Sequence, residues 1–308
     1  MPKVPPIVVA AVARGSSVTS ERLAAMHQEV LDLLHQHDVH PMSLSADGAD
    51  TERSVQRIIA NSTSDHLFFC IPNNAPNCSI EYKLPIAYGS HPLVITQDSK
   101  HAAKTARNQL HTGARMPTLG HYTAHYAMIR EVAENPASPL QSRDAKGLDK
   151  QDDRAAARLF SAQTLEFLTT HYNGRHGLAI YLFVLGELVD AWQNRSISHR
   201  ERVKMVLRAR FFLMAWRTHI LAHPDHSLDT HFISRQSYDI FITLSDSLIM
   251  LIVVHRKFFP LFPLLPWFHS TEPCEHYFGL LRQLKIDFAY IDVLHLERKA
   301  SIPSNGRY

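Results

Sequence analysis

Residues 39–59 read VHPMSLSADGADTERSVQRII, and this stretch decides the fold. Its first part predicts a short strand over residues 39–46. The strand ends at Asp47-Gly48, a dipeptide that is typical of turns. Thr51 then caps a predicted helix with an apolar inner face. A strand followed directly by an amphipathic helix favours an α/β core.

The same alternation extends to both sides of this stretch. Upstream, residues 6–13 (PIVVAAVA) predict a buried strand, and Ser20 caps a helix with an apolar face. Downstream, residues 67–71 and 93–96 predict two more strands, separated by a segment that opens rich in turn residues. The N-terminal third of the chain is therefore predicted to form a small α/β core.

The pattern changes after the last predicted strand. Residues 101–254 have a helical period almost throughout, with one predicted loop over residues 135–153. Residues 240–254 are apolar for most of their length but include Asp246, and the run is shorter than the ~20 residues of a membrane span. A buried core helix is the better interpretation, and no membrane partner is predicted, because a charge in mid-bilayer is costly.

Composition limits the class of protein. The 308 residues suffice for one large domain or two ordinary ones, and a net charge of +3 is too small to indicate nucleic-acid binding by itself. Three cysteines without CxxC spacing argue against a zinc finger and a disulfide framework. The N-terminus does not resemble a signal peptide. The protein is expected to be nuclear or cytoplasmic and not secreted.

Asp47 is the first candidate site residue. It follows a predicted strand, and ligands and metals bind at that edge of open α/β sheets. The alternative interpretation is an ordinary Asp-Gly turn that starts a helix.

Residues 270–282 (STEPCEHYFGLLR) provide the second candidate. They place Glu272 and Glu275 one helical turn apart, with apolar residues directly behind them, as expected at the mouth of a buried helix. Such a carboxylate can reach a metal ion or a hydroxyl nucleophile. The alternative is a solvated helix face, on which acid pairs at this spacing are common.

Residues 96–108 (TQDSKHAAKTARN) follow a predicted strand. Asp98 can cap a helix that carries His101, Lys104 and Arg107 on adjacent turns, and with Asn108 these can line a phosphate-binding face. The alternative is a helix cap followed by a solvated basic face.

Three further positions carry weaker signals. Asp190 lies near the end of a strongly apolar helix, where partial burial would raise its pKa, although a solvated helix end is the alternative. His219 and His223 share a helix face and can support a metal, but no Glu lies between them and Pro224 follows, which favours a polar loop. Phosphate loops, nucleophile elbows and dinucleotide fingerprints are missing from the sequence.

In this order, the segments resemble the RNase H-like core of P-element-type transposases, the group that includes the THAP-domain transposases. QDSKHAAKTARN is similar to the family pattern D-x-x-H-x-x-K-x-x-R-N, and LVDAWQNR around Asp190 is a looser match to a pattern of the family's helical insertion. TEPCEHYFGLLR matches a later family pattern at Glu275, Phe278, Gly279 and Arg282. The resemblance covers roughly residues 6–284.

The resemblance implies a fold. We expect an α/β protein with a partial RNase H-like core that is interrupted by a large, mainly α-helical insertion. The core is expected over residues 1–98, the insertion over residues 99–265, and a C-terminal helix that returns to the core over residues 266–300.

The resemblance also implies chemistry. Asp47 and Glu275 would be catalytic and would bind Mg²⁺ or Mn²⁺ for phosphodiester cleavage and strand transfer on DNA. Asp190, Asp98, His101 and Lys104 would line a cofactor site, with a guanine nucleotide as its occupant. DNA is the expected partner, and a homo-oligomer is compatible with the resemblance.

One departure from the family changes the functional expectation. The first predicted strand carries no acidic residue, whereas such cores need an aspartate there. We therefore expect a truncated, transposon-derived protein that is inactive as this chain. The alternative is a non-catalytic scaffold that binds DNA or protein through its helical part.

Overall fold

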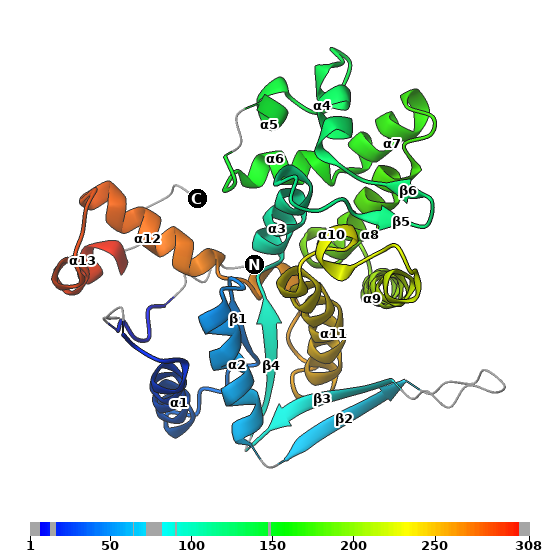
Figure 1. The fold of residues 1–308 in the computed structure, drawn as a ribbon. Coiled ribbons are helices and arrows are strands. Elements are labelled where there is room, and N and C mark those ends of the chain that lie inside the picture. Colours follow the sequence, from blue (N-terminus) through cyan, green and yellow to red (C-terminus); the bar gives the residue numbers. More distant parts are fainter. Residues whose placement is uncertain are drawn as a thin grey trace.

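A computed structural model describes residues 7–12, 17–63, 65–71, 82–89, 91–146 and 149–301. A small mixed sheet forms its α/β part (Figure 1), and its strands follow the spatial order β1-β4-β3-β2. β1 (Ser43–Ala46) pairs in parallel with β4 (Pro92–Gln97). β3 (Tyr82–Tyr88) is antiparallel to both β4 and β2 (His66–Ile71).

Helices flank β4 on both sides in Figure 1. α2 (Asp50–Ser62) contacts the sheet through Val55 and Ile59 and also packs on α1 (Ser20–Gln36). α11 (Arg235–Phe258) packs along β4 from the other side. α11 is apolar over most of its length because it lies between the sheet and the helical part of the molecule.

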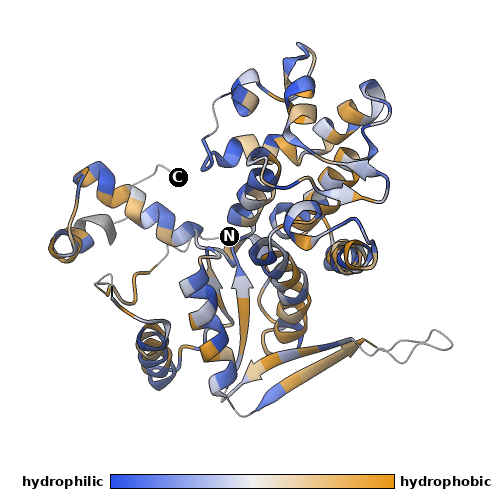
Figure 2. Cartoon of the chain, in the orientation of Figure 1, coloured by the Kyte–Doolittle hydropathy of each residue, from blue (hydrophilic) through white to orange (hydrophobic). Residues whose placement is uncertain are grey.

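The helical part is built around α8 (His176–Gln193), α9 (His199–Ala222) and α11, which pack on one another. Its buried residues form one continuous core with those of β3 and β4, and apolar residues run along these strands and α11 in Figure 2. The other helices are α3 (Ser99–His111), α4 (Tyr126–Glu134), α5 (Ser142–Lys146), α6 (Asp153–Leu159), α7 (Ala162–His171), α10 (Leu228–His231), η1 (Pro266–Phe268), α12 (Glu272–Leu284) and α13 (Tyr290–Ser301).

Several predicted elements are confirmed. The strands expected over residues 67–71 and 93–96 are β2 and β4, and the strand expected over residues 39–46 is the shorter β1. Asp98 caps α3 as predicted. The helix expected over residues 240–254 is a core helix, since Leu244, Leu248 and Leu251 are buried.

Among the described residues, α11 is one helix that is long and apolar enough to cross a membrane. Its most apolar window is 61% buried inside the protein. Core helices of soluble proteins pass the same test of length and composition, so this finding agrees with the prediction of a core helix.

The buried strand predicted over residues 6–13 is wrong within the described part of that segment. Residues 7–12 form no strand, and the side chain of Ile7 is 79% exposed. The run is apolar and β-branched, as in a strand, but its main chain does not join the sheet. Instead, the Tyr290 hydroxyl donates a hydrogen bond to the carbonyl oxygen of Ala11.

Three strands and one helix were not predicted. β3 lies in the second half of the segment that was interpreted as turn-rich, and it contains Pro85. A small hairpin of β5 (Thr118–Leu119) and β6 (Tyr122–Thr123) interrupts the region expected to be helical. α5 lies inside the segment expected to be a loop.

Candidate functional site

Asp98 joins three parts of the molecule where β4 ends. Its Oδ1 accepts hydrogen bonds from the main-chain N–H groups of Lys100 (2.7 Å) and His101 (3.0 Å) and so caps α3. Its Oδ2 accepts hydrogen bonds from the N–H (2.8 Å) and the hydroxyl (2.7 Å) of Thr271. The side chain is buried, and both oxygens are engaged. The residue just before α12 is therefore held against the end of β4.

Asp47 lies beside Asp98 at the same edge of the sheet. The register pairs Ala46 with Gln97, and the Asp98 N–H donates to the Ala46 carbonyl (2.8 Å). Because neighbouring strands lie ~4.8 Å apart, the main chains of Asp47 and Asp98 are close. Asp47 is exposed, and one of its carboxylate oxygens accepts a hydrogen bond from the Ala49 N–H (2.9 Å). A carboxylate is thus available where β1 ends.

Gly48 fixes the turn that presents Asp47. Its φ of 95° favours glycine, and an added Cβ would lie 3.0 Å from the Cδ1 of Ile240. The Gln236 amide donates to the Gly48 carbonyl (3.1 Å). The turn is therefore packed against α11, so the direction of the chain at Asp47 is set by the core.

The first turn of α12 carries the two glutamates. Glu272 forms an ion pair with the Lys100 Nζ (2.6 Å), which adds a second link between α12 and α3. The Glu275 side chain is exposed and has no hydrogen bond or ion pair with the described residues. α12 is not the buried helix that the sequence predicted, because Leu281 is its one buried residue and Phe278 is 43% exposed.

The four carboxylates therefore differ in what they can bind. Asp98 and Glu272 are used in contacts within the protein, whereas Asp47 and Glu275 are exposed. Within the described ranges, no group of three or more His, Cys, Asp or Glu side chains is arranged to hold a metal ion. The shared metal site of Asp47 and Glu275 remains a prediction.

The basic residues of α3 fasten a neighbouring segment. Lys104 is buried and forms an ion pair with the Asp153 Oδ1 (3.0 Å). The buried Arg107 guanidinium donates to the carbonyl oxygens of Asp149 (2.9 Å) and Asp152 (3.0 Å). His101 lies on the same helix and is half-buried. Lys104 and Arg107 therefore do not belong to the solvated basic face that was the alternative interpretation, because they tie α3 to residues 149–153.

A pocket of about 570 Å³ lies between α3, α6 and α8, with a size typical of small-molecule sites. Asp190 and Gln193 line it from α8, and Arg154 and Lys100 line it from α6 and α3. Phe160 supplies an apolar wall. Asp153 and Gln163 also line it, so the pocket combines two acids, two amides and two cations on an apolar lining.

Asp190 and Arg154 are the available charges in this pocket. Neither side chain has a hydrogen bond or an ion pair with the described part of the chain, whereas Lys100 is paired with Glu272 and Asp153 with Lys104. Burial, and to a smaller degree the nearby Glu187, raise the pKa of Asp190 above the ordinary value for aspartate. The Gln193 amide nitrogen donates to the Ser99 hydroxyl (2.6 Å), which leaves its oxygen as an acceptor.

Asp190 could be identified from the sequence, whereas its neighbours in the pocket were missed. Gln193 follows Asp190 by three residues on α8, a spacing that places both on one helix face, so this signal was present in the sequence. Arg154 comes from α6, and no local pattern connects it to Asp190. Thr271 was also missed, since its role depends on Asp98, which is 173 residues away.

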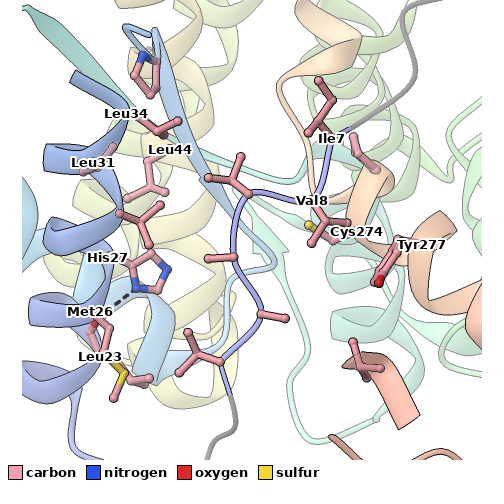
Figure 3. A pocket seen from close by; sticks show the side chains of 18 of the residues that line it. Ile7, Val8, Leu23, Met26, His27, Leu31, Leu34, Leu44, Cys274 and Tyr277 are labelled. Atoms are coloured by element: carbon pink, nitrogen blue, oxygen red, sulfur yellow. Dashed lines mark hydrogen bonds between the residues drawn. The ribbon is translucent and has the colours of Figure 1, made fainter. Parts of the chain in front are cut away.

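A second cavity, of about 620 Å³, is an apolar groove beside the sheet (Figure 3). Residues 7–12 line it together with α1, and Cys274 and Tyr277 line it from α12. Leu44 of β1, the strand at the end of the sheet, forms another part of the wall. None of the described residues that line this groove is an aspartate or a glutamate, so its lining differs from that of the sheet edge with Asp47.

The architecture is that of an α/β protein with a small mixed sheet and a large helical part. Among solved structures it is similar to a Drosophila P element transposase in a strand transfer complex. The TM-score is 0.66 at 15% sequence identity, and the match covers 93% of this chain and 65% of the transposase chain. No family model and no curated protein matches the sequence.

The likeness establishes a transposase-like fold for this chain, as the sequence resemblance led us to expect. The chain spans less than two thirds of the length of the transposase chain.

Proposed function

We propose that this protein is a transposon-derived, transposase-like protein that binds DNA. In this proposal the edge with Asp47 and Glu275 is a degenerate RNase H-like metal site without strand-transfer activity of its own. The main support for the proposal is that the chain returns, after α11, to the end of β4. There Thr271 donates two hydrogen bonds to Asp98. This contact brings the first turn of α12 to the strand ends at which α/β sheets bind ligands.

The chemistry of the edge supports weak metal binding. Mg²⁺ and Mn²⁺ prefer oxygen ligands, and two-metal catalysis needs several carboxylates around ions ~3.5–4 Å apart. Asp47 and Glu275 are exposed, but Asp98 has both oxygens engaged and Glu272 is paired with Lys100. Two available carboxylates are too few to hold two metal ions firmly, so we propose an inactive remnant.

We expect Mn²⁺ to bind the full chain weakly, with a dissociation constant on the order of millimolar. Asp47→Ala or Glu275→Ala should weaken this binding about tenfold, since each substitution removes one charged ligand. Titration calorimetry or the paramagnetic effect of Mn²⁺ measures this. DNA binding, measured by fluorescence anisotropy, should fall with salt and persist in both variants. Glu134→Ala, an exposed carboxylate on α4, is the matched control.

Three outcomes would contradict the proposal. Metal-dependent DNA cleavage that disappears in Asp47→Ala would make the chain a working enzyme. Mn²⁺ binding that is unchanged in both variants would remove the metal site. DNA binding that is absent at low salt would favour the scaffold that binds protein.

We further propose that the pocket of Asp190 takes a guanine nucleotide. A guanine base presents adjacent N–H donors, which a carboxylate such as Asp190 accepts, while Arg154 and Lys100 can face the phosphates. Phe160 offers an apolar surface to the base. The unpaired carboxylate of Asp190 supports this proposal most directly, because an acid without a partner in a pocket gains from a ligand that donates to it.

We expect Asp190→Ala to weaken GDP binding ~10- to 100-fold, because a donor pair of the base loses its acceptor. Fluorescence titration with a labelled GDP analogue measures this. Glu201→Ala, an exposed acid on α9, should leave GDP affinity unchanged. Equal affinity for ADP and GDP in the wild-type protein would contradict guanine recognition.

A further inference from the structure

Four histidines form a stacked cluster at the corner between α9 and α10. The rings of His223 and His226 have their centroids 3.9 Å apart, and those of His226 and His231 lie 4.6 Å apart, both nearly parallel. His219 lies one turn back on α9, 6.2 Å from both His223 and His226. We call these four side chains the histidine corner.

The hydrogen bonds of the histidine corner require neutral rings. The Asp225 N–H donates to the His223 Nδ1 (3.2 Å), and the Ser227 N–H donates to the His231 Nδ1 (3.1 Å). A main-chain N–H can only donate, so each Nδ1 must carry a lone pair. Protonation places hydrogen on both ring nitrogens, so each Nδ1 becomes a donor that faces a main-chain donor. The His231 Nδ1 keeps one acceptor within reach, the Thr230 hydroxyl at 2.7 Å.

The charges around the histidine corner oppose protonation as well. His226 has a buried Nδ1 without a partner, and its neighbours are the other three imidazoles and Asp225. Burial, followed by these imidazoles, lowers the pKa of His226, whereas Asp225 acts in the opposite direction. Asp229 of α10 faces Arg115 at 3.8 Å, so this acid is already paired.

The histidine corner holds a distant segment of the chain. The Met116 N–H donates to the Thr230 carbonyl (2.7 Å), and the Arg115 guanidinium donates to the Leu228 carbonyl (2.6 Å). These contacts fix the segment that leads from α3 to the β5–β6 hairpin. Loss of the corner would free this segment from α10.

We propose that the histidine corner is an acid-sensitive latch that releases α10 and residues 115–118 when its imidazoles are protonated. Neutral rings complete the hydrogen bonds of the corner and hold α10 on the connection to β5. Protonated rings repel one another and the main-chain N–H groups they face, so the corner opens.

The direction of the pH effect follows from linkage. A histidine with a lowered pKa in the folded state binds fewer protons there than in the opened state. The contribution of His226 to the stability of the corner is therefore complete above pH ~6.5 and is lost as the pH falls below that value. Burial lowers the pKa of His111 and His269 to about 4, so at pH 5.5 these two remain mostly neutral.

Hydrogen–deuterium exchange of the full chain at pH 7.5 and 5.5, corrected for intrinsic rates, tests the latch. Peptides that cover residues 112–120 and 223–233 should exchange faster at pH 5.5 than at pH 7.5 after this correction. Peptides of α8 and α11 should not change. An equal increase across the whole chain, or no increase at the corner, would overturn the proposal.

A double variant tests whether faster exchange at pH 5.5 comes from the histidine corner or from other groups that are protonated in acid. His226→Phe keeps a stacking ring, and His231→Asn keeps an acceptor for the Ser227 N–H, but neither new residue titrates in this range. The double variant should stay protected at pH 5.5, whereas His276→Gln on α12 should behave as wild type. Should the double variant fail to fold, an NMR titration of His226 in the wild type decides: a pKa at or above 6.5 would overturn the latch.

Discussion

Asp98→Ala is expected to lower the free energy of unfolding by about 3–5 kcal/mol, which is a large part of the 5–15 kcal/mol typical of folded proteins. The substitution removes the cap of α3, a loss of ~0.5–2 kcal/mol in itself. It also leaves the N–H and the hydroxyl of Thr271 without their acceptor at the start of α12. Urea denaturation followed by tryptophan fluorescence measures the loss.

Two milder substitutions separate the contribution of the α3 cap to this loss of stability from the contribution of the Thr271 contact. Asp98→Asn keeps one oxygen for the cap of α3 but turns an NH₂ group toward the Thr271 N–H, so an intermediate loss is expected. Thr271→Val removes one hydrogen bond and should cost about 1 kcal/mol. A stability of Asp98→Ala within 1 kcal/mol of wild type would show that α12 is held to the sheet by other contacts.

Gly177→Ala is expected to destabilise the protein by about 3 kcal/mol or more. An added Cβ at residue 177 would lie 2.7 Å from the carbonyl carbon of Thr123 and closer still to its oxygen. The added Cβ is bonded to the main chain of α8 and would meet the main chain of β6. No side-chain rotation can relieve this contact, so α8 would have to move away from β6. The better helix propensity of alanine, worth ~1 kcal/mol, is too small to compensate. Thermal and urea denaturation measure the change.

Gly279→Ala provides the matched control. Gly279 is also helical, but nothing lies within 4 Å of the position of an added Cβ on α12. This substitution should stabilise the protein by up to about 1 kcal/mol through helix propensity. The same destabilisation from both substitutions would mean that loss of a helical glycine, and not close packing at Thr123, is responsible.

Helices and strands that are marked by residues close to them in the sequence could be predicted from local patterns. β4 is an apolar run, and Asp98 after it caps α3, so strand, cap and helix could all be predicted from neighbouring residues. α11 could be predicted because its apolar run is longer than a strand. The transposase-like fold could also be predicted, since its motifs occur in the expected order.

Elements that depend on distant partners could not be predicted in the same way. Residues 7–12 have the composition of a strand, but a strand also needs a neighbour, and the sheet ends at β1 instead. β3 contains Pro85 and follows turn residues, yet it pairs with both β2 and β4. In the candidate sites, Asp47 and Asp190 could be proposed from local sequence, whereas the Asp98–Thr271 contact and Arg154 required the fold.

The contact between Asp98 and Thr271 has a consequence for synthesis on the ribosome. The two residues are 173 positions apart. At ~5–20 residues per second, the end of β4 emerges roughly 10–35 s before its partner is made. During that interval α3 is already capped by one oxygen of Asp98, while the other has no protein donor. The helical part therefore has time to fold first, and the attachment of α12 is expected to be the last step of maturation.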